Sequence, residues 1–333
     1  MSLPISRRTT LAGLAASLSM PVAAQGTAGA TVIYTSNSAQ SVEAVTDVAR
    51  KIMPNLKLST VTGGSGQLLR RIEAEAANAQ CDVFWSSSAN TLGAFKQFFE
   101  PYKVKDQGAI PAALRHPQDL WTAANLHVAV LMVNKSQLGG LPPPATWADV
   151  LDPKFRGKLI IADPANSSTA YTILWGVEKM LGAEGLKALA NNVKVTASAP
   201  TVLRSVGQGE FAIGLTFESN AYAYVAGGQK EIMLAYPADG TYTTPEFFAL
   251  VKGAPGGTLA QQTCDLLAAK EVQIALLESA FRRPARTDIE VSKYVELPEL
   301  SKIKVFVTNE DEAAAQRKDF LARWAALAAA SGN

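Results

Sequence analysis

Histidine and cysteine are scarce in this sequence, which has two residues of each type among 333. His116 and His127 form no cluster with Cys81 and Cys264, so the ligand spacing of a zinc or copper site is missing. The shortage of histidine also argues against a Ser-His-Asp hydrolase function, because that mechanism needs an imidazole base beside the serine. We therefore expect no resident metal or other cofactor and no chemical step. The two cysteines either pair or remain buried thiols, and their spacing does not decide between these.

Charged residues are also few, at 18% of the chain, and neither sign dominates. Two of the 31 basic residues, Arg7 and Arg8, lie in the first 24 positions, so the remainder is balanced against 29 acidic residues. A balanced chain is a poor partner for a polyanion, and we expect no nucleic-acid ligand. A chain of this length usually folds as two domains or one large one.

Two familiar phosphate-binding motifs are absent from the glycine loop TVTGGSGQLLRRIEAE at residues 60–75. No Lys-Ser or Lys-Thr pair follows Gly66, as a Walker A loop requires, and leucine stands where a dinucleotide-binding loop needs its third glycine. The loop also lacks the G-x-S-x-G spacing of a nucleophile elbow, although a secreted serine hydrolase remains an alternative. What the loop does offer is a set of backbone N–H groups at a helix start, which suits a small anion.

The first 24 residues have the pattern of an export signal. A twin arginine precedes an apolar run at residues 11–20 that is too short to span a membrane, and Ala24 ends a small-residue cleavage site. The paired arginines favour the twin-arginine route, with ordinary Sec export as the alternative. We expect the mature chain to be periplasmic.

After this leader, strand patterns alternate with helical patterns. TVIYTS reads as a buried strand, LKLSTVT alternates as a strand and CDVFWSSS reads as a third strand, and each is followed by a segment of helical spacing. This order predicts a parallel sheet covered by helices, whose ligands gather at the carboxyl ends of the strands. Those ends are small and polar here, at residues 35–38, 63–66 and 86–88. We therefore expect a binding site along this edge.

A second unit begins near LHVAVLMVNK. Its strand KLIIAD runs into PANSSTAY, where short polar residues stand at a helix start. EFAIGLTFE is a further strand, and it ends at Glu218 just before another helix. His127 lies in an apolar run and is expected to be an interior side chain, as are Tyr34 and Trp85. Arg204 is a candidate cation for the site or a surface residue.

These motifs together resemble a type 2 periplasmic solute-binding protein of an ABC importer. The likeness rests on the leader, on VIYTS followed by a helix, and on GGSGQLLRRIEAEAANAQCDVFWSSS, TWADVLDPKFRGKLIIADPANSSTAY and VGQGEFAIGLTFESNAYAYVAGG. The pattern from Trp147 to Lys158 is specific to the cluster that binds ferric iron, phosphorylated sugars or phosphonates. The resemblance implies an α/β fold of two lobes joined by crossing strands, with a ligand cleft between them. We expect the leader at 1–24, lobe 1 at 25–125 plus about 240–290, lobe 2 at 126–239, and a C-terminal helical segment at 291–333 that packs on the lobes.

The resemblance also bears on the ligand. In the iron-binding members, a histidine in the first loop and two adjacent tyrosines hold the metal, and phenolates suit a hard ferric ion. Ser38 stands at the histidine position, and Glu218-Ser219 stands where the tyrosine pair would be. Tyr222 and Tyr224 are nearby, but residues two apart on a helix project in different directions. Ferric iron, alone or with an anion, is therefore the alternative, and a small phosphorylated or phosphonate-type organic anion is favoured.

We expect N–H groups and hydroxyls at the helix starts to hold the anionic group, and Glu218 to bind an amine or hydroxyls at the other end. The resemblance implies a permease and an ATPase at the membrane as partners, and we expect the chain to be a monomer. The residues expected to contact the ligand are Ser36, Asn37, Ser38, Gly64, Ser65, Gly66, Ser87, Ser88, Ser167, Ser168, Thr169 and Glu218.

Overall fold

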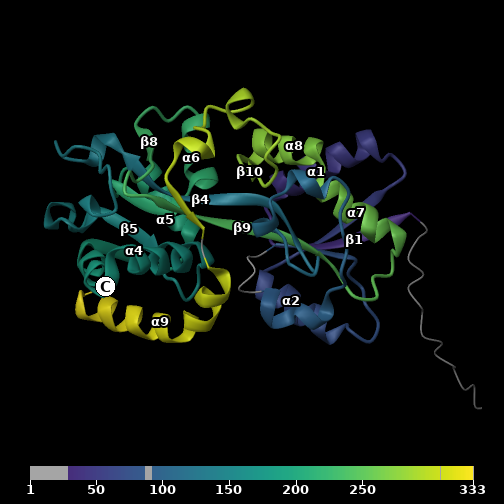
Figure 1. Ribbon diagram of the computed structural model, residues 1–333. Helices are drawn as coiled ribbons and strands as arrows, with labels where there is room; N and C mark the ends of the chain where they lie inside the picture. Colours follow the sequence, from purple (N-terminus) through teal and green to yellow (C-terminus); the bar gives the residue numbers. More distant parts are fainter. Residues whose placement is uncertain (1–28, 87–91, 308, 333) are drawn as a thin grey trace, which may run out of the picture.

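The computed structural model describes residues 29–86, 92–307 and 309–332. The predicted leader at 1–24 and the candidates Ser87 and Ser88 lie outside these residues. Within them the structure is a mixed α/β arrangement of two lobes (Figure 1). The lobe boundaries expected from the sequence stay a prediction, and "lobe 1" and "lobe 2" refer below to the two groups of elements that follow.

Lobe 1 is built on three parallel strands, with β1 between β2 and β3. The parallel order expected from the alternating pattern is confirmed here. Helix α1 starts at a serine whose side chain accepts a hydrogen bond from Ser41 N, and it has two basic residues in its last turn. The segment Gly93–Phe98, expected to be helical, is a 3₁₀ helix. The elements are β1 (Ala30–Thr35), α1 (Ala39–Ile52), β2 (Lys57–Thr62), α2 (Ser65–Ala74), β3 (Val83–Trp85), α7 (Thr258–Ala268), α8 (Lys270–Ala280) and β10 (Arg283–Pro284).

Lobe 2 is built on β7, β5 and β6, which run parallel to one another. Helix α4 bends at Gly182, which adopts a φ of 72°. The elements are β5 (Leu159–Ala162), α4 (Ser168–Asn192), β6 (Val193–Thr196), α5 (Ala199–Gly207), β7 (Ile213–Phe217), α6 (Glu218–Ala226), β8 (Ile232–Ala235), β11 (Val305–Val307) and α9 (Glu310–Ala330).

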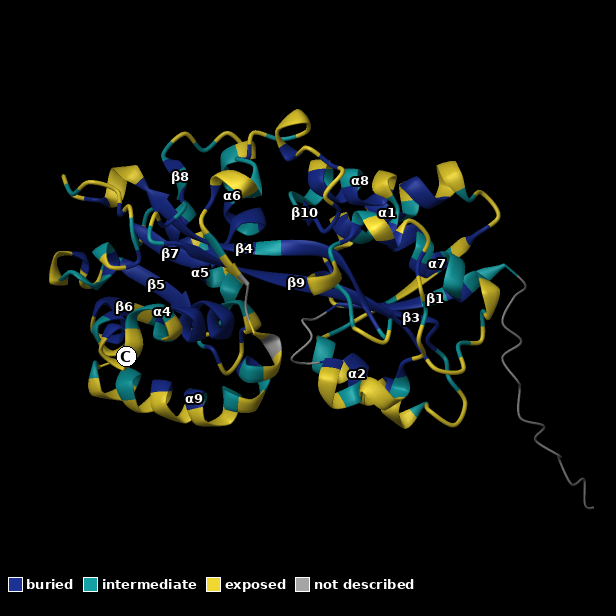
Figure 2. Cartoon of the chain, in the orientation of Figure 1, coloured by how far each residue is buried: buried dark blue, intermediate teal, exposed yellow. Residues whose placement is uncertain are grey.

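Two long strands, β4 (Thr122–Asn134) and β9 (Thr241–Leu250), run from one lobe to the other (Figure 1). They pair antiparallel, and the strand order β2-β1-β3-β9-β4-β7-β5-β6 places them in the middle of one continuous sheet. Figure 2 shows both strands almost wholly buried, whereas α2 and α9 expose one face to solvent. Crossing strands of this length make the lobes part of one sheet, so residues on β4 and β9 form the floor between them.

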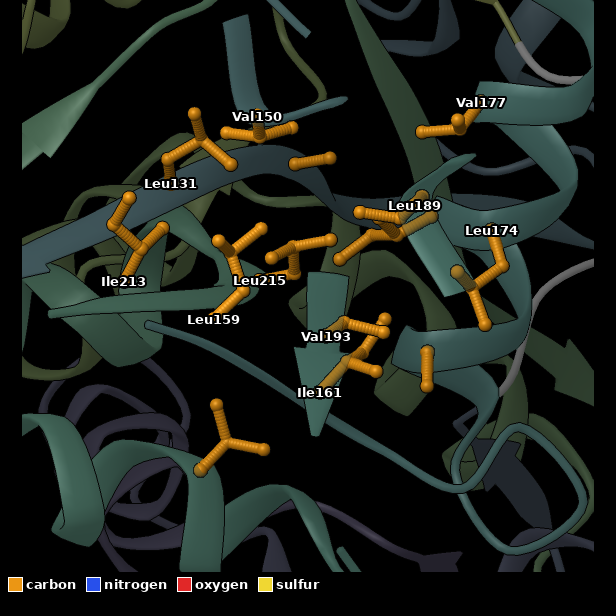
Figure 3. Packing of buried hydrophobic residues seen from close by; sticks show 14 of the residues in the cluster. Leu131, Val150, Leu159, Ile161, Leu174, Val177, Leu189, Val193, Ile213 and Leu215 are labelled. Carbon is orange, nitrogen blue, oxygen red and sulfur yellow. The ribbon is translucent and has the colours of Figure 1, made fainter. Parts of the chain in front are cut away.

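Each lobe has its own cluster of buried apolar side chains. Tyr34 and Trp85 lie in the lobe 1 cluster, as expected. Cys81 and Cys264 lie there too, as free buried thiols, and burial raises the pKa of both. Figure 3 shows the lobe 2 cluster, in which aliphatic side chains from β4, β5, β7 and α4 interlock. Trp147 is fully buried in this cluster. Helix α9 contributes further side chains to it, so the C-terminal segment packs on lobe 2.

Gly176 on α4 is a position where only glycine fits. A Cβ built there would lie 2.6 Å from the ring of Tyr242, whose hydroxyl donates to Gly176 O. We expect Gly176→Ala to destabilise the fold by about 1–3 kcal/mol, because the buried ring must shift out of a packed core. Chemical denaturation measures this change. The control is Gly108→Ala, where the added methyl meets open space; equal stability of the two variants would contradict the packing.

No helix among the described residues is long and apolar enough to cross a membrane.

Candidate functional site

A cavity of about 860 Å³ opens between the two lobes, a size typical of small-molecule sites. Its walls come from the ends of β1 and the start of α2 on lobe 1, and from the starts of α4 and α6 on lobe 2. The crossing strands and the first residues after α8 supply the floor, and α9 closes one side. The predicted residues that line this cavity are Ser36, Asn37, Ser65, Gly66, Ser168 and Thr169. That these residues contact a ligand stays a prediction.

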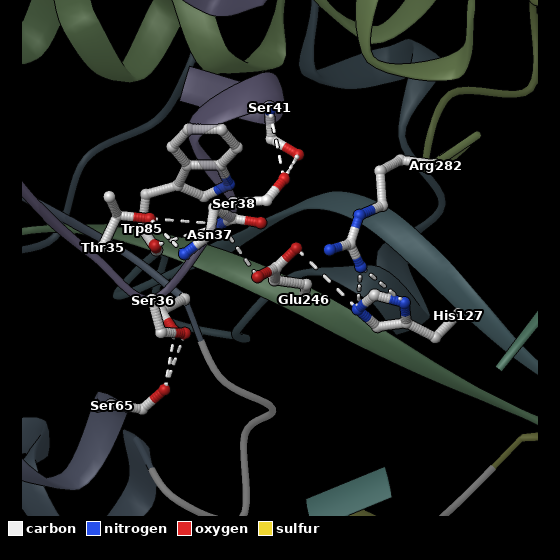
Figure 4. Close-up of polar contacts among 11 residues, drawn as sticks. Thr35, Ser36, Asn37, Ser38, Ser41, Ser65, Trp85, His127, Glu246 and Arg282 are labelled. Atoms are coloured by element: carbon white, nitrogen blue, oxygen red, sulfur yellow. Dashed lines mark hydrogen bonds and ion pairs between the residues drawn. The ribbon is translucent and has the colours of Figure 1, made fainter. Parts of the chain in front are cut away.

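Three serines meet at the lobe 1 wall. Ser65 Oγ donates to Ser36 Oγ at 3.0 Å and lies 2.7 Å from Ser86 Oγ, and Ser36 and Ser86 also share a hydrogen bond. These serines follow β1, β2 and β3, so the expected convergence of strand ends is observed; Figure 4 shows Ser36 beside Ser65. Each hydroxyl has one proton and two lone pairs, so the three mutual hydrogen bonds use the three protons and leave a lone pair on each oxygen.

Two helix starts at the cavity have backbone donors without a hydrogen-bond partner in the described chain. Gly64, at the N-cap of α2, supplies no side-chain cap, and the N–H groups of Ser65 and Gly66 make no hydrogen bond within the described chain. On lobe 2 the N–H groups of Ser168 and Thr169 are likewise open at the start of α4. Because helix N-termini carry a partial positive charge, these four donors favour an anion.

Three predicted residues act as parts of helix starts and do not line the cavity. Ser38 caps α1 through Ser41 N, and Ser167 caps α4 through Ala170 N at 3.2 Å. Gly64 is the N-cap of α2. Gly64 and Ser167 precede the first turns of α2 and α4, whose residues line the cavity, whereas no residue of α1 lines it.

Glu218 requires a correction. The sequence places it at a strand end, where we expected it to bind the far end of the ligand, but its side chain is only 2% exposed and does not line the cavity. Arg283 Nη2 donates to Glu218 Oε1 at 2.7 Å, and Arg283 Nε donates to Oε2. Tyr236 also donates its hydroxyl to Glu218. The carboxylate is therefore occupied by protein donors, and it joins α6 to β10.

Three arginines that the sequence did not single out line the cavity: Arg70 on α2, Arg282 after α8 and Arg317 on α9. None of them forms an ion pair within the described residues. Arg317 stacks on the ring of Tyr171, 4.5 Å from its centroid. Unpaired guanidinium groups around one cavity give it a positive potential, which attracts anions. Arg204, in contrast, is exposed on α5 and lies outside the cavity.

A chain of polar groups crosses the cavity floor (Figure 4). Asn37 Nδ2 donates to Glu246 Oε1 at 3.0 Å, and Glu246 Oε2 lies 3.8 Å from His127 Nε2. Arg282 Nη1 lies 3.0 Å from His127 Nδ1 and 3.1 Å from Nε2. Burial, and then the nearby Arg282 charge, lower the pKa of His127 well below its usual range, so the imidazole is neutral at physiological pH. Burial also raises the pKa of Glu246.

The sequence did contain a signal for two of these residues. Glu246 is the single charged residue in the strand TYTTPEFFAL, and Arg282 precedes a second arginine and a proline. A single charge in a buried strand needs a partner or a function. His127, expected to be interior, has a side chain that is 12% exposed, with its ring stacked on Phe217 at 4.8 Å, and it forms part of the cavity floor.

Comparison with known proteins identifies the family to which this chain belongs. The family model described as bacterial extracellular solute-binding protein matches residues 77–316. A protein proposed to bind 2-aminoethylphosphonate in the periplasm of Salmonella typhimurium is 24% identical over 290 residues, which cover 79% of this chain and 81% of that protein.

Two solved structures are similar to this fold. The periplasmic binding protein AfuA from Actinobacillus pleuropneumoniae, with fructose-6-phosphate bound, matches with a TM-score of 0.76 and 24% identity over 89% of this chain and 98% of that one. Iron-bound HitA from Pseudomonas aeruginosa matches with a TM-score of 0.76 and 17% identity, over 90% of this chain and 99% of that one. At these identities the likeness supports the two-lobed fold and leaves the ligand open.

Proposed function

Because this chain belongs to the bacterial extracellular solute-binding protein family, we propose that it captures a small phosphorylated or phosphonate-type organic anion in the periplasm for import. The observation that carries the proposal is the charge of the cavity. Three arginines without a carboxylate partner in the described chain line it together with four open N–H groups at two helix starts. Such a site stabilises a compact oxyanion and needs no metal.

The anion would lie between the lobes. Ser65 and Gly66 reach it from lobe 1, Ser168 and Thr169 from lobe 2, and Arg282 from the floor. Contacts from both sides are made together only when the lobes close, so ligand binding favours the closed arrangement. The closed complex, as a monomer, would deliver its ligand to a permease and an ATPase at the membrane.

Ferric iron is less well supported as the ligand. The described residues contain no group of three or more histidine, cysteine, aspartate or glutamate side chains that could hold a metal ion. Tyr171 lines the cavity, but its hydroxyl donates to Ala313 O. Tyr222 and Tyr224 lie outside the lining, and Tyr222 Oη accepts from Glu296 N. A hard ferric ion would thus meet arginines in place of phenolates.

A serine hydrolase is also less well supported. Its nucleophile needs a base within hydrogen-bond reach. The hydroxyl of Ser65 contacts Ser36 and Ser86, while the ring nitrogens of His127 contact Arg282. No serine–histidine hydrogen bond is present among the described residues that line the cavity.

A thermal-shift screen tests the proposal against the iron alternative. We expect phosphorylated sugars or phosphonates at saturating concentration to raise the unfolding temperature by about 5 °C or more, because a ligand at 1,000 times its Kd adds about 4 kcal/mol. Inorganic phosphate, carboxylates and ferric citrate are the comparison ligands. A large shift with ferric citrate and none with any phosphorus compound would overturn the proposal.

A further inference from the structure

Two of the cavity arginines lie beside helix starts, one on each lobe. On lobe 1, the Arg70 side chain folds back along α2, so that its Nη1 lies 3.6 Å from the place that a Cβ on Gly66 would take. Both residues line the cavity. The next residue, Arg71, pairs with Glu75 at 2.7 Å, whereas Arg70 forms no ion pair within the described residues. The Arg70 charge is therefore not offset by an acidic side chain there.

On lobe 2, Arg317 of α9 has the same relation to α4. Its guanidinium group stacks on the ring of Tyr171, 4.5 Å from the centroid, and its Nη2 donates to Pro164 O at 3.4 Å. Pro164 precedes and Tyr171 follows Ser168, the first residue of α4, so the guanidinium lies beside the first turn of that helix. Arg323 on α9 pairs with an acidic residue of α4, whereas Arg317 forms no ion pair within the described residues.

Each arginine thus completes a group of donors, which we call a half-site. The lobe 1 half-site is Arg70 with the N–H groups of Ser65 and Gly66, and the lobe 2 half-site is Arg317 with the N–H groups of Ser168 and Thr169. A guanidinium group can present two parallel N–H donors, and the two backbone N–H groups raise the number to four. An ionised carboxylate has about four lone-pair sites, so one half-site can satisfy one anionic group by itself.

The two half-sites belong to different lobes, since Figure 1 shows α2 on one lobe and α4 with α9 on the other. The cavity of about 860 Å³ between them has room for a small organic molecule that reaches both. Three guanidinium groups and one carboxylate, that of Glu246, are the charges among the described lining residues, so the cavity has an excess of two positive charges. A ligand with one anionic group would leave one half-site without a counter-ion when the lobes close, which is costly.

We propose that the ligand carries two separate anionic groups, of which one is a phosphate or phosphonate and the other a carboxylate or a second phosphate, and that each half-site binds one of them. Such a ligand spans the cavity and joins the lobes, so the separation of its two groups decides how tightly it binds. This inference rests on the proposed function and narrows its ligand class to organic anions with two anionic ends.

Calorimetric titration of the wild-type chain with matched pairs of ligands tests the two half-sites. Phosphonoacetate, 3-phosphonopropionate and 4-phosphonobutyrate are each compared with their carboxylate methyl esters, which have nearly the same shape but only one anionic group. Fructose 1,6-bisphosphate is compared with fructose 6-phosphate in the same way. In at least one pair we expect the ligand with two anionic groups to bind about tenfold tighter or more, and we expect this advantage to vary with the separation of the groups.

Arg70→Gln and Arg317→Gln then assign the advantage to the half-sites. In each variant we expect the best ligand with two anionic groups to bind about tenfold more weakly, whereas its partner with one group, which can use the other half-site, changes by less than about threefold. Both ligands are titrated into the same variant, so a loss of folded protein would lower the stoichiometry of both alike. Arg204→Gln, at the exposed position on α5 outside the cavity, is the matched control and should keep the wild-type ratio.

The outcomes separate the two proposals. Equal binding within every pair would overturn the two half-sites and leave the proposed function standing. An advantage of the same size at every separation, or one that both substitutions leave unchanged, would come from the general positive potential of the cavity and would also overturn them. Equal weakening of both members of a pair by the substitutions would mean that one anionic group bridges the lobes. If no phosphorus compound binds, the proposed function itself fails.

Discussion

Glu218→Ala should lower the free energy of unfolding by about 3–5 kcal/mol, because it leaves the Arg283 charge buried without its partner. The Glu218 and Arg283 side chains are each 2% exposed, and two hydrogen bonds join the guanidinium to the carboxylate. Arg283 also donates to Pro298 O at 2.7 Å, so the pair links α6 and β10 to the segment that follows β10. Denaturation with urea measures the loss.

Two further variants show that the loss arises from the unpaired charge. The double variant Glu218→Leu with Arg283→Met removes both charges and should recover much of the stability, since a buried ion pair can be replaced by apolar side chains at little cost. Glu73→Ala, at an exposed position, should change stability by less than about 0.5 kcal/mol. If Glu218→Ala instead left stability unchanged and weakened ligand binding, Glu218 would be a ligand contact after all.

Arg282→Gln should weaken binding of a phosphonate or phosphate ester by roughly 10- to 100-fold, because charge-assisted hydrogen bonds contribute about 1.5–3 kcal/mol each. Arg282 is half-buried at the cavity floor, and its described side-chain partners are the ring nitrogens of His127. A neutral imidazole accepts from the guanidinium without neutralising it, so the charge stays available to an anion. Calorimetric titration measures the change in Kd.

The matched control is Arg204→Gln, which removes the same charge from an exposed position on α5 outside the cavity. Its affinity should equal that of the wild-type chain. Unchanged binding by Arg282→Gln together with weaker binding by Arg204→Gln would place the anion outside this cavity.

The parts of the site that sequence reasoning found are local ones. Ser36 and Ser65 follow β1 and β2 directly, and parallel neighbours always bring their carboxyl ends to the same edge of a sheet. Ser168 and Thr169 begin α4 after β5, by the same rule on lobe 2. For these residues the order of strands and helices along the chain is enough.

The floor of the cavity depends on contacts between distant segments. Asn37 and Glu246 are 209 positions apart, and His127 and Arg282 are 155 apart. They meet because β4 and β9 cross between the lobes, and an alternation pattern cannot show which neighbours a fully buried strand will have. Burial on both faces also removes the periodicity that would separate a cavity residue from a core residue.

Glu218 shows the opposite failure. A strand end just before a helix is a common place for a ligand contact, and the position was identified correctly. The direction of the side chain was not predicted correctly, because it is set by Arg283, which lies 65 positions further along the chain. A buried cation that reaches a carboxylate from a distant segment leaves no local mark in the sequence.

Calorimetric titration of the wild-type chain with 2-aminoethylphosphonate, fructose 6-phosphate and ferric citrate tests most directly whether the cavity between the lobes holds a small organic anion. We predict that one equivalent of a phosphonate or phosphate ester binds and that Arg282→Gln weakens this binding. Saturable binding of one ferric ion, with no heat from any phosphorus ligand, would contradict it.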